Sequence, residues 1–188
     1  MSRCLSVTSP IVPESALFFD RLQIMEVTLK QHVAASIGSL PSELQDQALQ
    51  WFERLEDQHD AASLTHERTA SLLRIVACSE FAATVLLKEW HWFAEHADGF
   101  GEATDLETEF RHTVFADDVD VLKSELRRFR NRYLLRILWR EVFELADLDE
   151  TLLQLSLLAD LMLDVAMRSA ERLLEPRYGR LRDDAGQV

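Results

Sequence analysis

Apolar residues recur along most of this chain at steps of three and four, the period of an α-helix that buries one face. These periods predict six helices, over about residues 15–37, 41–57, 63–77, 79–89, 117–145 and 150–174. A further short, acidic helix is expected after residue 104. Alternation of β-branched and polar residues, the mark of a half-buried strand, is absent from the sequence. The pattern therefore predicts an all-α fold, a single helical-bundle domain of about six or seven helices.

The breaks between the predicted helices carry residues that begin and end helices. Ser79 and the Thr104–Glu107 capping box are placed to start helices, and Gly38 is placed to stop one. The two longest helices are joined only by residues 146–149, which predicts a long antiparallel C-terminal pair. Pro176 and Gly179 are expected to end the last helix. The predicted organisation is an arm over residues 1–14, a helical domain over 15–179 and a linker tail over 180–188.

The apolar faces identify the expected core. Before the basic helix the predicted buried positions are Leu17, Phe18, Leu22, Met25, Leu29, Val33, Leu44, Leu49, Phe52 and Leu55. In the basic helix they are Leu122, Leu126, Phe129, Tyr133 and Ile137, with Leu138 and Trp139 extending the apolar side. Trp90, Trp92 and Phe93 are expected to pack in the core and at its edge rather than to stack on a ligand. Cys78 is interpreted as a small buried residue.

Charge is distributed unevenly along the 188 residues. The net charge is −13, yet residues 123–140 carry seven basic residues and one acid, which leaves −19 for the rest. Within this stretch Arg128, Arg132, Arg136 and Arg140 follow one another at steps of four and form an arginine ridge. The acidic segments 102–120 and 141–150 could neutralise this ridge within the chain. Alternatively, the ridge faces an acidic partner or the phosphates of a neighbouring active site. Nucleic acid is disfavoured because the acidic remainder would repel a phosphate backbone.

Several other classes of protein are disfavoured. No uncharged run of 18 residues is present, so no membrane span is expected, and the N-terminal residues lack the apolar core of a secretion signal. The expected location is the cytoplasm. Two distant cysteines predict no disulfide framework. Glu56 with His59 and Glu109 with His112 match the Glu-x-x-His spacing of di-iron bundles, but both pairs are interpreted as chance matches. No catalytic, cofactor or metal residue is predicted in this chain.

A family resemblance rests on motifs in order. They are Ser79-Glu80-Phe81, Glu89-Trp90, Leu126-Arg127, Phe129-Arg130, Arg132, Arg136-Ile137, Trp139-Arg140 and the helix over residues 153–179. Their order and spacing resemble the N-terminal helical region of the bifunctional glutamine synthetase adenylyltransferase/adenylyl-removing enzymes. The resemblance implies a parent enzyme that transfers AMP from ATP, with Mg, to a tyrosine of glutamine synthetase, and removes it by phosphorolysis under the PII signalling protein. Arg130, Arg132 and Arg136 match the family pattern and are the expected interaction residues.

The catalytic motifs of that family are not found here. The family uses a glycine-rich turn and an SDxDL strand, whereas no two of the five glycines here are adjacent. Asp118–Asp120 and Asp147–Asp149 are interpreted as acidic helix starts. The chain stops at Val188, about where the first catalytic strand would begin, so a cut fragment or a truncated copy without activity is expected. The alternative is a stand-alone all-helical interaction module. In either case the chain is expected to be monomeric.

Overall fold

The computed structural model describes residues 30–60, 64–103, 105–113 and 115–179, and across these ranges it is helical with no strand. The α-helices are α2 Ser42–Gln58, α3 His66–Cys78, α4 Glu80–Lys88, α5 Trp90–His96, α6 Leu106–His112, α7 Val119–Val142 and α8 Leu148–Tyr178. Residues 30–37 are also helical, and a 3-10 turn spans Ala97–Gly99. The all-α prediction is confirmed. In the described part of the chain, no helix is both long and apolar enough to cross a membrane.

The chain divides into two compact units, with the boundary between Cys78 and Ser79. The predicted helical domain over residues 15–179 spans the boundary between the two units, and its own limits stay a prediction. The predicted arm and tail lie outside the described residues, as do the predicted core positions Leu17, Phe18, Leu22, Met25 and Leu29.

In the first unit, α2 and α3 pack against each other. The buried face of α2 consists of Ala48, Trp51, Phe52 and Leu55, which recur at helical steps. The prediction that Leu49 is buried was wrong: it is 38% exposed, because it lies one residue, about 100° of helix rotation, beyond Ala48.

Cys78 is exposed, so the prediction of a buried thiol was also wrong. The cause is its register on α3. It follows the exposed Arg74 by four residues and therefore shares the outer face of the helix, whereas Leu72 and Val76 point into the core.

The second unit begins with a capped helix. As predicted, the Ser79 side chain accepts a hydrogen bond from the backbone N–H of Ala82, at 3.2 Å, and α4 follows. Trp90 and Phe93 of α5 are buried, which confirms their predicted packing role. The two glycines among residues 97–101 predict a loop there. Phe100 in this segment is only 1% exposed. Its ring packs edge-on against Phe93 and Trp139, which draws the turn into the core.

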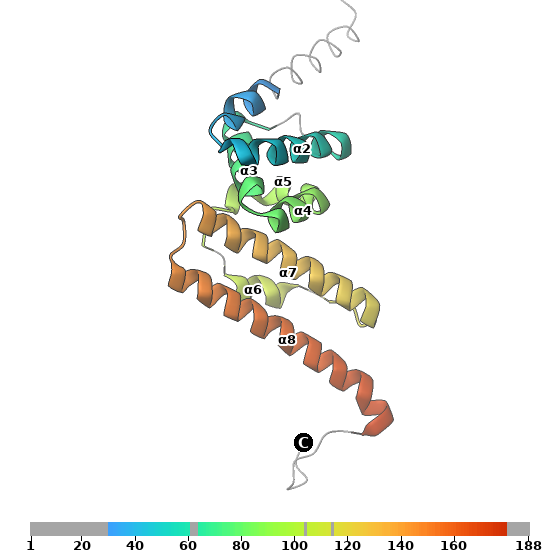
Figure 1. Cartoon of the computed structure of the whole chain (residues 1–188). Helices are drawn as coiled ribbons and strands as arrows, with labels where there is room; N and C mark the ends of the chain where they lie inside the picture. Colours follow the sequence, from blue (N-terminus) through green and yellow to red (C-terminus); the bar gives the residue numbers. More distant parts are fainter. Residues whose placement is uncertain (1–29, 61–63, 104, 114, 180–188) are drawn as a thin grey trace, which may run out of the picture. The chain divides into compact units, whose positions relative to one another are not determined.

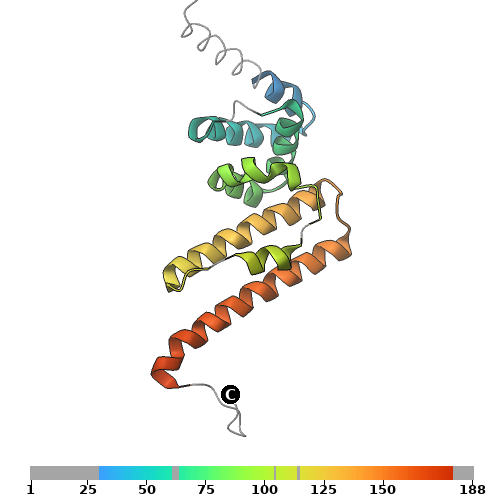
Figure 2. The ribbon, with the colours of Figure 1, turned by 180° about the vertical axis from the view of Figure 1, so that it is seen from behind.

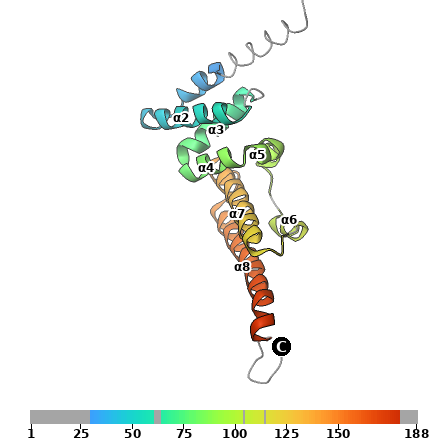
Figure 3. The same ribbon diagram turned by 90° about the vertical axis from the view of Figure 1, so that its right-hand side faces the viewer.

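α7 is the central helix of this unit and is buried on two sides. It contacts α4 as well as α8, and α6 lies against α8 (Figures 1 and 3). Of the predicted stripe, Leu122, Phe129 and Tyr133 are buried, and the last two join a core cluster with α6 and α8. Leu135 is fully buried although it lies off that stripe. A helix with neighbours on two sides buries residues that a single-stripe interpretation leaves out.

α7 and α8 form the predicted antiparallel pair, seen from two opposite sides in Figures 1 and 2. Asp118 and Asp147 cap their N-termini by accepting backbone hydrogen bonds, so the acidic strings are helix starts as predicted. The last helix is longer than expected, because Pro176 lies inside it and α8 ends at Tyr178. Gly179 follows as the C-cap, and its φ of +75° suits glycine.

Candidate functional site

The arginine ridge of α7 becomes progressively more buried along the helix. The exposed fraction of the side chain falls from 58% at Arg128 to 28% at Arg132, 13% at Arg136 and 10% at Arg140. Every one of these four guanidinium groups has a carboxylate within 4 Å. Their four-residue spacing places them on one side of α7, but what surrounds each of them changes along that side.

Glu89, between α4 and α5, holds the first two arginines. Arg132 donates from Nε at 2.8 Å and from Nη2 at 2.5 Å to one oxygen, Oε2. Arg128 approaches the other oxygen less closely, with its Nε at 3.5 Å. The Glu89 side chain is only 16% exposed, so the pair with Arg132 is partly shielded from solvent and geometrically constrained. Glu89 belongs to neither acidic segment that the sequence suggested.

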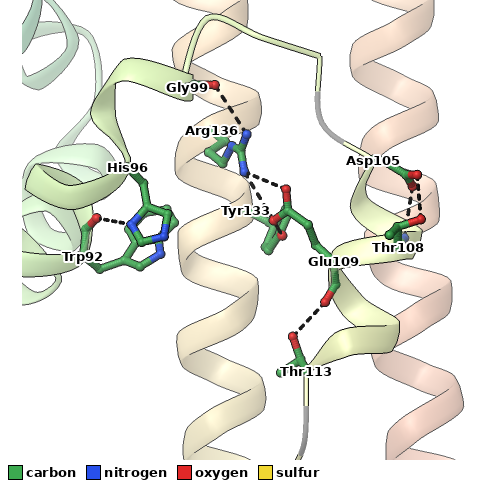
Figure 4. A network of polar contacts seen from close by, with 9 residues as sticks. All are labelled: Trp92, His96, Gly99, Asp105, Thr108, Glu109, Thr113, Tyr133 and Arg136. Atoms are coloured by element: carbon green, nitrogen blue, oxygen red, sulfur yellow. Dashed lines mark hydrogen bonds and ion pairs between the residues drawn. The ribbon is translucent and has the colours of Figure 1, made fainter.

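Glu109 of α6 is the next carboxylate along the ridge. It accepts a hydrogen bond from the Tyr133 hydroxyl and two from Arg136 Nη1, at 3.2 and 3.4 Å (Figure 4). Arg136 also donates from Nη2 to the carbonyl oxygen of Gly99, at 3.4 Å. The guanidinium lies 5.8 Å from the ring centroids of Phe100 and Tyr133, which partly compensates its buried Nε, a donor without an acceptor. Arg136 thus ties α6 and the turn after α5 to α7.

Arg140 is the most completely engaged member of the ridge. It donates to the carbonyl oxygens of Gly101 at 2.6 Å and Leu145 at 2.9 Å, and to the carboxylate of Glu150 at 2.7 Å. Glu109 and Glu150 do lie in the two acidic segments expected to neutralise the ridge. At this end of α7 the arginines therefore serve the fold of the unit itself.

A cavity of about 470 Å³ lies beside the less buried end of the ridge, between α5, α6 and α7. Its lining includes Trp92, His96, Glu109, His112, Arg128 and Arg132. The Trp92 ring has His96 stacked 5.2 Å away, and the guanidinium of Arg132 lies 5.0 Å from its centroid. Trp92 therefore packs against His96 and Arg132 at the edge of the core, as predicted. The ring of His96 is turned back so that its Nδ1 donates to the carbonyl oxygen of Trp92, at 2.8 Å (Figure 4).

Charges of both signs line the cavity, because Glu109 and Glu125 lie there together with the arginines. Arg128 and Arg132 both line it, and of their N–H groups only Nε of Arg128 and Nε and Nη2 of Arg132 contact Glu89. A guanidinium carries five donors, so further donors remain for a carboxylate or phosphate. Among the described residues no cluster of three metal-ligating side chains is found. Glu109, of the Glu-x-x-His pair considered above, is taken up by Tyr133 and Arg136.

The acidic helix on the far side of the cavity is capped by Asp105 (Figure 4). Its carboxylate accepts from the hydroxyl of Thr108 at 2.6 Å and from the backbone N–H of the same residue at 3.0 Å. These two bonds, the hydroxyl first, hold the pKa of Asp105 below its ordinary value of 3.8. The predicted capping box was one residue out of place: Asp105 is the cap, and Thr104 lies outside the described residues.

A family model described as glutamate-ammonia ligase adenylyltransferase matches residues 69–187, well over half of the chain. The chain belongs to this family. The matched range holds all of α4 to α8, including the arginine ridge and the cavity. The adenylyltransferase family resemblance read from the α7 motifs is therefore confirmed.

Curated relatives of this adenylyltransferase family member carry the name bifunctional glutamine synthetase adenylyltransferase/adenylyl-removing enzyme. The protein from Shewanella loihica is 31% identical over 154 residues, which is 79% of this chain and 16% of the relative. The Pseudomonas aeruginosa protein is 34% identical over 64% of this chain and 13% of its own length. The Thioalkalivibrio sulfidiphilus protein is 31% identical over 81% and 16%. The chain thus spans about a sixth or less of these relatives, and no solved structure matches it.

In this family member the predicted acidic segments supply Glu109 and Glu150 to the ridge, whereas Glu89 lies outside both of them. Of the expected interaction residues, Arg132 and Arg136 are engaged with Glu89 and Glu109. Arg130 points elsewhere: it is exposed, and its Nη2 donates to the side chain of Asn131, at 3.1 Å. Glu89 carried one usable signal, its place beside Trp90 in a family motif.

Proposed function

We propose that this chain is the N-terminal helical part of an enzyme that adenylylates glutamine synthetase and removes the adenylyl group by phosphorolysis. The observation that carries the proposal is the family match across the whole of α4 to α8. The names of the relatives state the two activities and the protein acted upon. In the complete enzyme the partners would be glutamine synthetase and the PII signalling protein, and ATP with Mg would be used. Its site of action would be the cytoplasm.

The proposed role of the described units is support and access rather than chemistry. The ridge makes α7 a rigid element, because guanidinium–carboxylate pairs fasten it to α6 and to the start of α8. Rigid elements position reacting groups better than loops do. We infer that the cavity beside Arg128 and Arg132 receives an acidic segment of a partner.

We expect the isolated 188-residue chain to release no AMP from adenylylated glutamine synthetase in the presence of phosphate. The family's glycine-rich turn and SDxDL string are not found in this sequence, and phosphoryl-type transfer depends on such metal-holding groups. The measurement is release of labelled AMP, with a full-length relative as the positive control. Phosphate-dependent release of AMP that this chain retains after repurification would falsify the proposal that the described units support the enzyme without taking part in the chemistry. Binding to glutamine synthetase without release would leave the interaction-module alternative in place.

Arg130 is the expected interaction residue that the fold needs least. Its replacement by alanine should change the free energy of unfolding by under about 1 kcal/mol, because an exposed guanidinium contributes little. The same change in a full-length enzyme of the family should lower AMP removal if this surface meets a partner. Lys123, a basic residue that is also exposed on α7 but belongs to none of the family motifs, is the control. Equal activity of the Arg130→Ala enzyme and the unchanged enzyme would remove Arg130 from the proposed interface.

A further inference from the structure

α8 exposes a long row of large apolar side chains. They are Leu148, Leu152, Leu155, Leu163, Met167, Leu174 and Tyr178, each between 38% and 68% exposed. These residues follow one another at helical steps of three or four, except in two places. The exposed Ala159 lies between Leu155 and Leu163, and the exposed Ala170 lies between Met167 and Leu174, so that the steps of three and four continue. We call these nine residues the α8 stripe. Its members lie on one face of the helix.

The α8 stripe is separate from the face that α8 uses within its own unit. That inner face carries the buried Leu158, with Leu161, Met162 and Val165 packed against the core cluster. Figures 1 and 2 show α6 and α7 on one side of α8, with no other described element of the second unit on its opposite side. The helix therefore has two apolar faces, and its own unit covers only one of them.

The extent of the stripe is unusual for a surface. The 30 steps from Leu148 to Tyr178 span about 45 Å at about 1.5 Å per residue. At about 10 Å of helix width the flat footprint is on the order of 450 Å², and side-chain relief adds to it. Contiguous apolar patches beyond a few hundred Å² mark interaction sites in soluble proteins. Two such footprints together approach the lower end of a specific interface, about 1,200 Å².

We propose that the α8 stripe binds the same stripe of a second copy of this chain, antiparallel, with a two-fold axis at Leu163. This interaction surface is independent of the proposed function. It replaces the monomer expected from the sequence, where the stripe could not be told from a core face.

The order of side chains along the stripe supports an antiparallel arrangement. Leu152 and Leu174 each lie 11 residues from Leu163, on opposite sides, so an antiparallel pair brings leucine to leucine. Ala159 and Met167 each lie four residues away, which sets a small side chain opposite a long one. A two-fold interface uses the same patch on both copies and needs this kind of self-complementarity.

The distribution of charge along α8 also favours an antiparallel pair. Residues 148–164 contain four acids and no basic residue, whereas residues 165–178 contain three arginines and two glutamates. A parallel pair would place the two acidic halves side by side, while an antiparallel pair places each against the half that holds the arginines. Arg168 and Arg172 already pair with Asp164 and Asp117 of their own chain, but both arginines are more than 60% exposed and can exchange partners.

The first test is the mass of the full chain in solution, by sedimentation or light scattering over a range of concentrations. We expect a dimer whose fraction rises with concentration, because the footprint is small for an interface. Leu163→Glu should give the monomer mass at every concentration, with unchanged helix content by circular dichroism. Val121→Glu, at a 46% exposed position on α7, is the matched control and should remain dimeric. A monomer at all concentrations, as expected if another protein or domain covers the stripe, overturns the proposal, as does a dimer indifferent to Leu163→Glu.

Engineered cysteines test the register, after Cys4 and Cys78 are replaced by serine. Residues on a two-fold axis face their own copies, so Leu163→Cys should form a disulfide-linked dimer on mild oxidation. Leu152→Cys alone should not, but mixed with Leu174→Cys it should cross-link. Efficient self-linking by Leu152→Cys would show a parallel pair and refute the antiparallel arrangement.

Discussion

Replacing Phe129 by alanine is expected to lower the free energy of unfolding of the second unit by about 3–5 kcal/mol. The side chain is only 9% exposed, and its ring stacks on Tyr133 with a centroid separation of 4.3 Å. It also meets Phe110 of α6 edge-on, at 5.1 Å. Truncation would leave a cavity between α6, α7 and α8 and remove both ring contacts. Urea titration followed by circular dichroism measures the loss.

Phe81 is the matched control for this change. It is also a phenylalanine in a helix of the second unit, but 38% of it is exposed. Its truncation removes less buried area and leaves a site open to water, so the loss of stability should be markedly smaller. Comparable losses for the two variants would mean that the ring cluster around Phe129 does not hold the unit together.

Replacing Arg140 by methionine is expected to cost about 2–4 kcal/mol, the largest effect of any arginine in the ridge. The substitution keeps most of the apolar stem but removes every donor. The carbonyl oxygens of Gly101 and Leu145 would lose their partner, and Glu150 would lose its counter-charge. The residue is only 8% exposed, so water cannot readily replace these contacts. Because Arg140 joins the end of α7 to the start of α8, the hairpin turn should also lose protection from hydrogen exchange.

Arg128→Met serves as the comparison at the other end of the ridge. Arg128 is mostly exposed, and its Nε lies 3.5 Å from Glu89, whose other oxygen is held by Arg132. An exposed ion pair of this kind contributes under about 1 kcal/mol. The two variants thus test the gradient of burial along one helix face with one chemical change. If Arg128→Met lowered the free energy of unfolding as much as Arg140→Met, burial along the ridge would not determine how much each arginine stabilises the unit.

Much of the local structure could be predicted from the sequence because its causes are local. Helical periods in apolar residues and the near absence of strand patterns indicated an all-α chain. Ser79, Asp118 and Asp147 could be recognised as helix starts because a capping side chain bonds to backbone only two or three residues away. The short connection between α7 and α8 likewise left little choice but an antiparallel pair.

The partners of the arginines depended on tertiary structure. The four-residue spacing of the ridge was visible in the sequence, but Glu89 meets Arg132 across 43 residues and Glu109 meets Arg136 across 27. No local period encodes such a distance, because it results from how α5 and α6 pack on α7. The same packing makes Arg140 a buried structural residue and leaves Arg128 beside an open cavity.

Burial on more than one side was the other feature that only the tertiary structure decided. A single-stripe interpretation of α7 omitted Leu135, and a loop interpretation missed Phe100, yet both side chains are fully buried. α8 shows the reverse, since its apolar residues exceed what its own unit covers. By itself the sequence determined most of the helical segments, though not α5, as well as where most of them begin and which family they resemble. Which helix faces meet, and which stay open, follows from packing between distant segments, where one apolar pattern fits a core or an interface equally well.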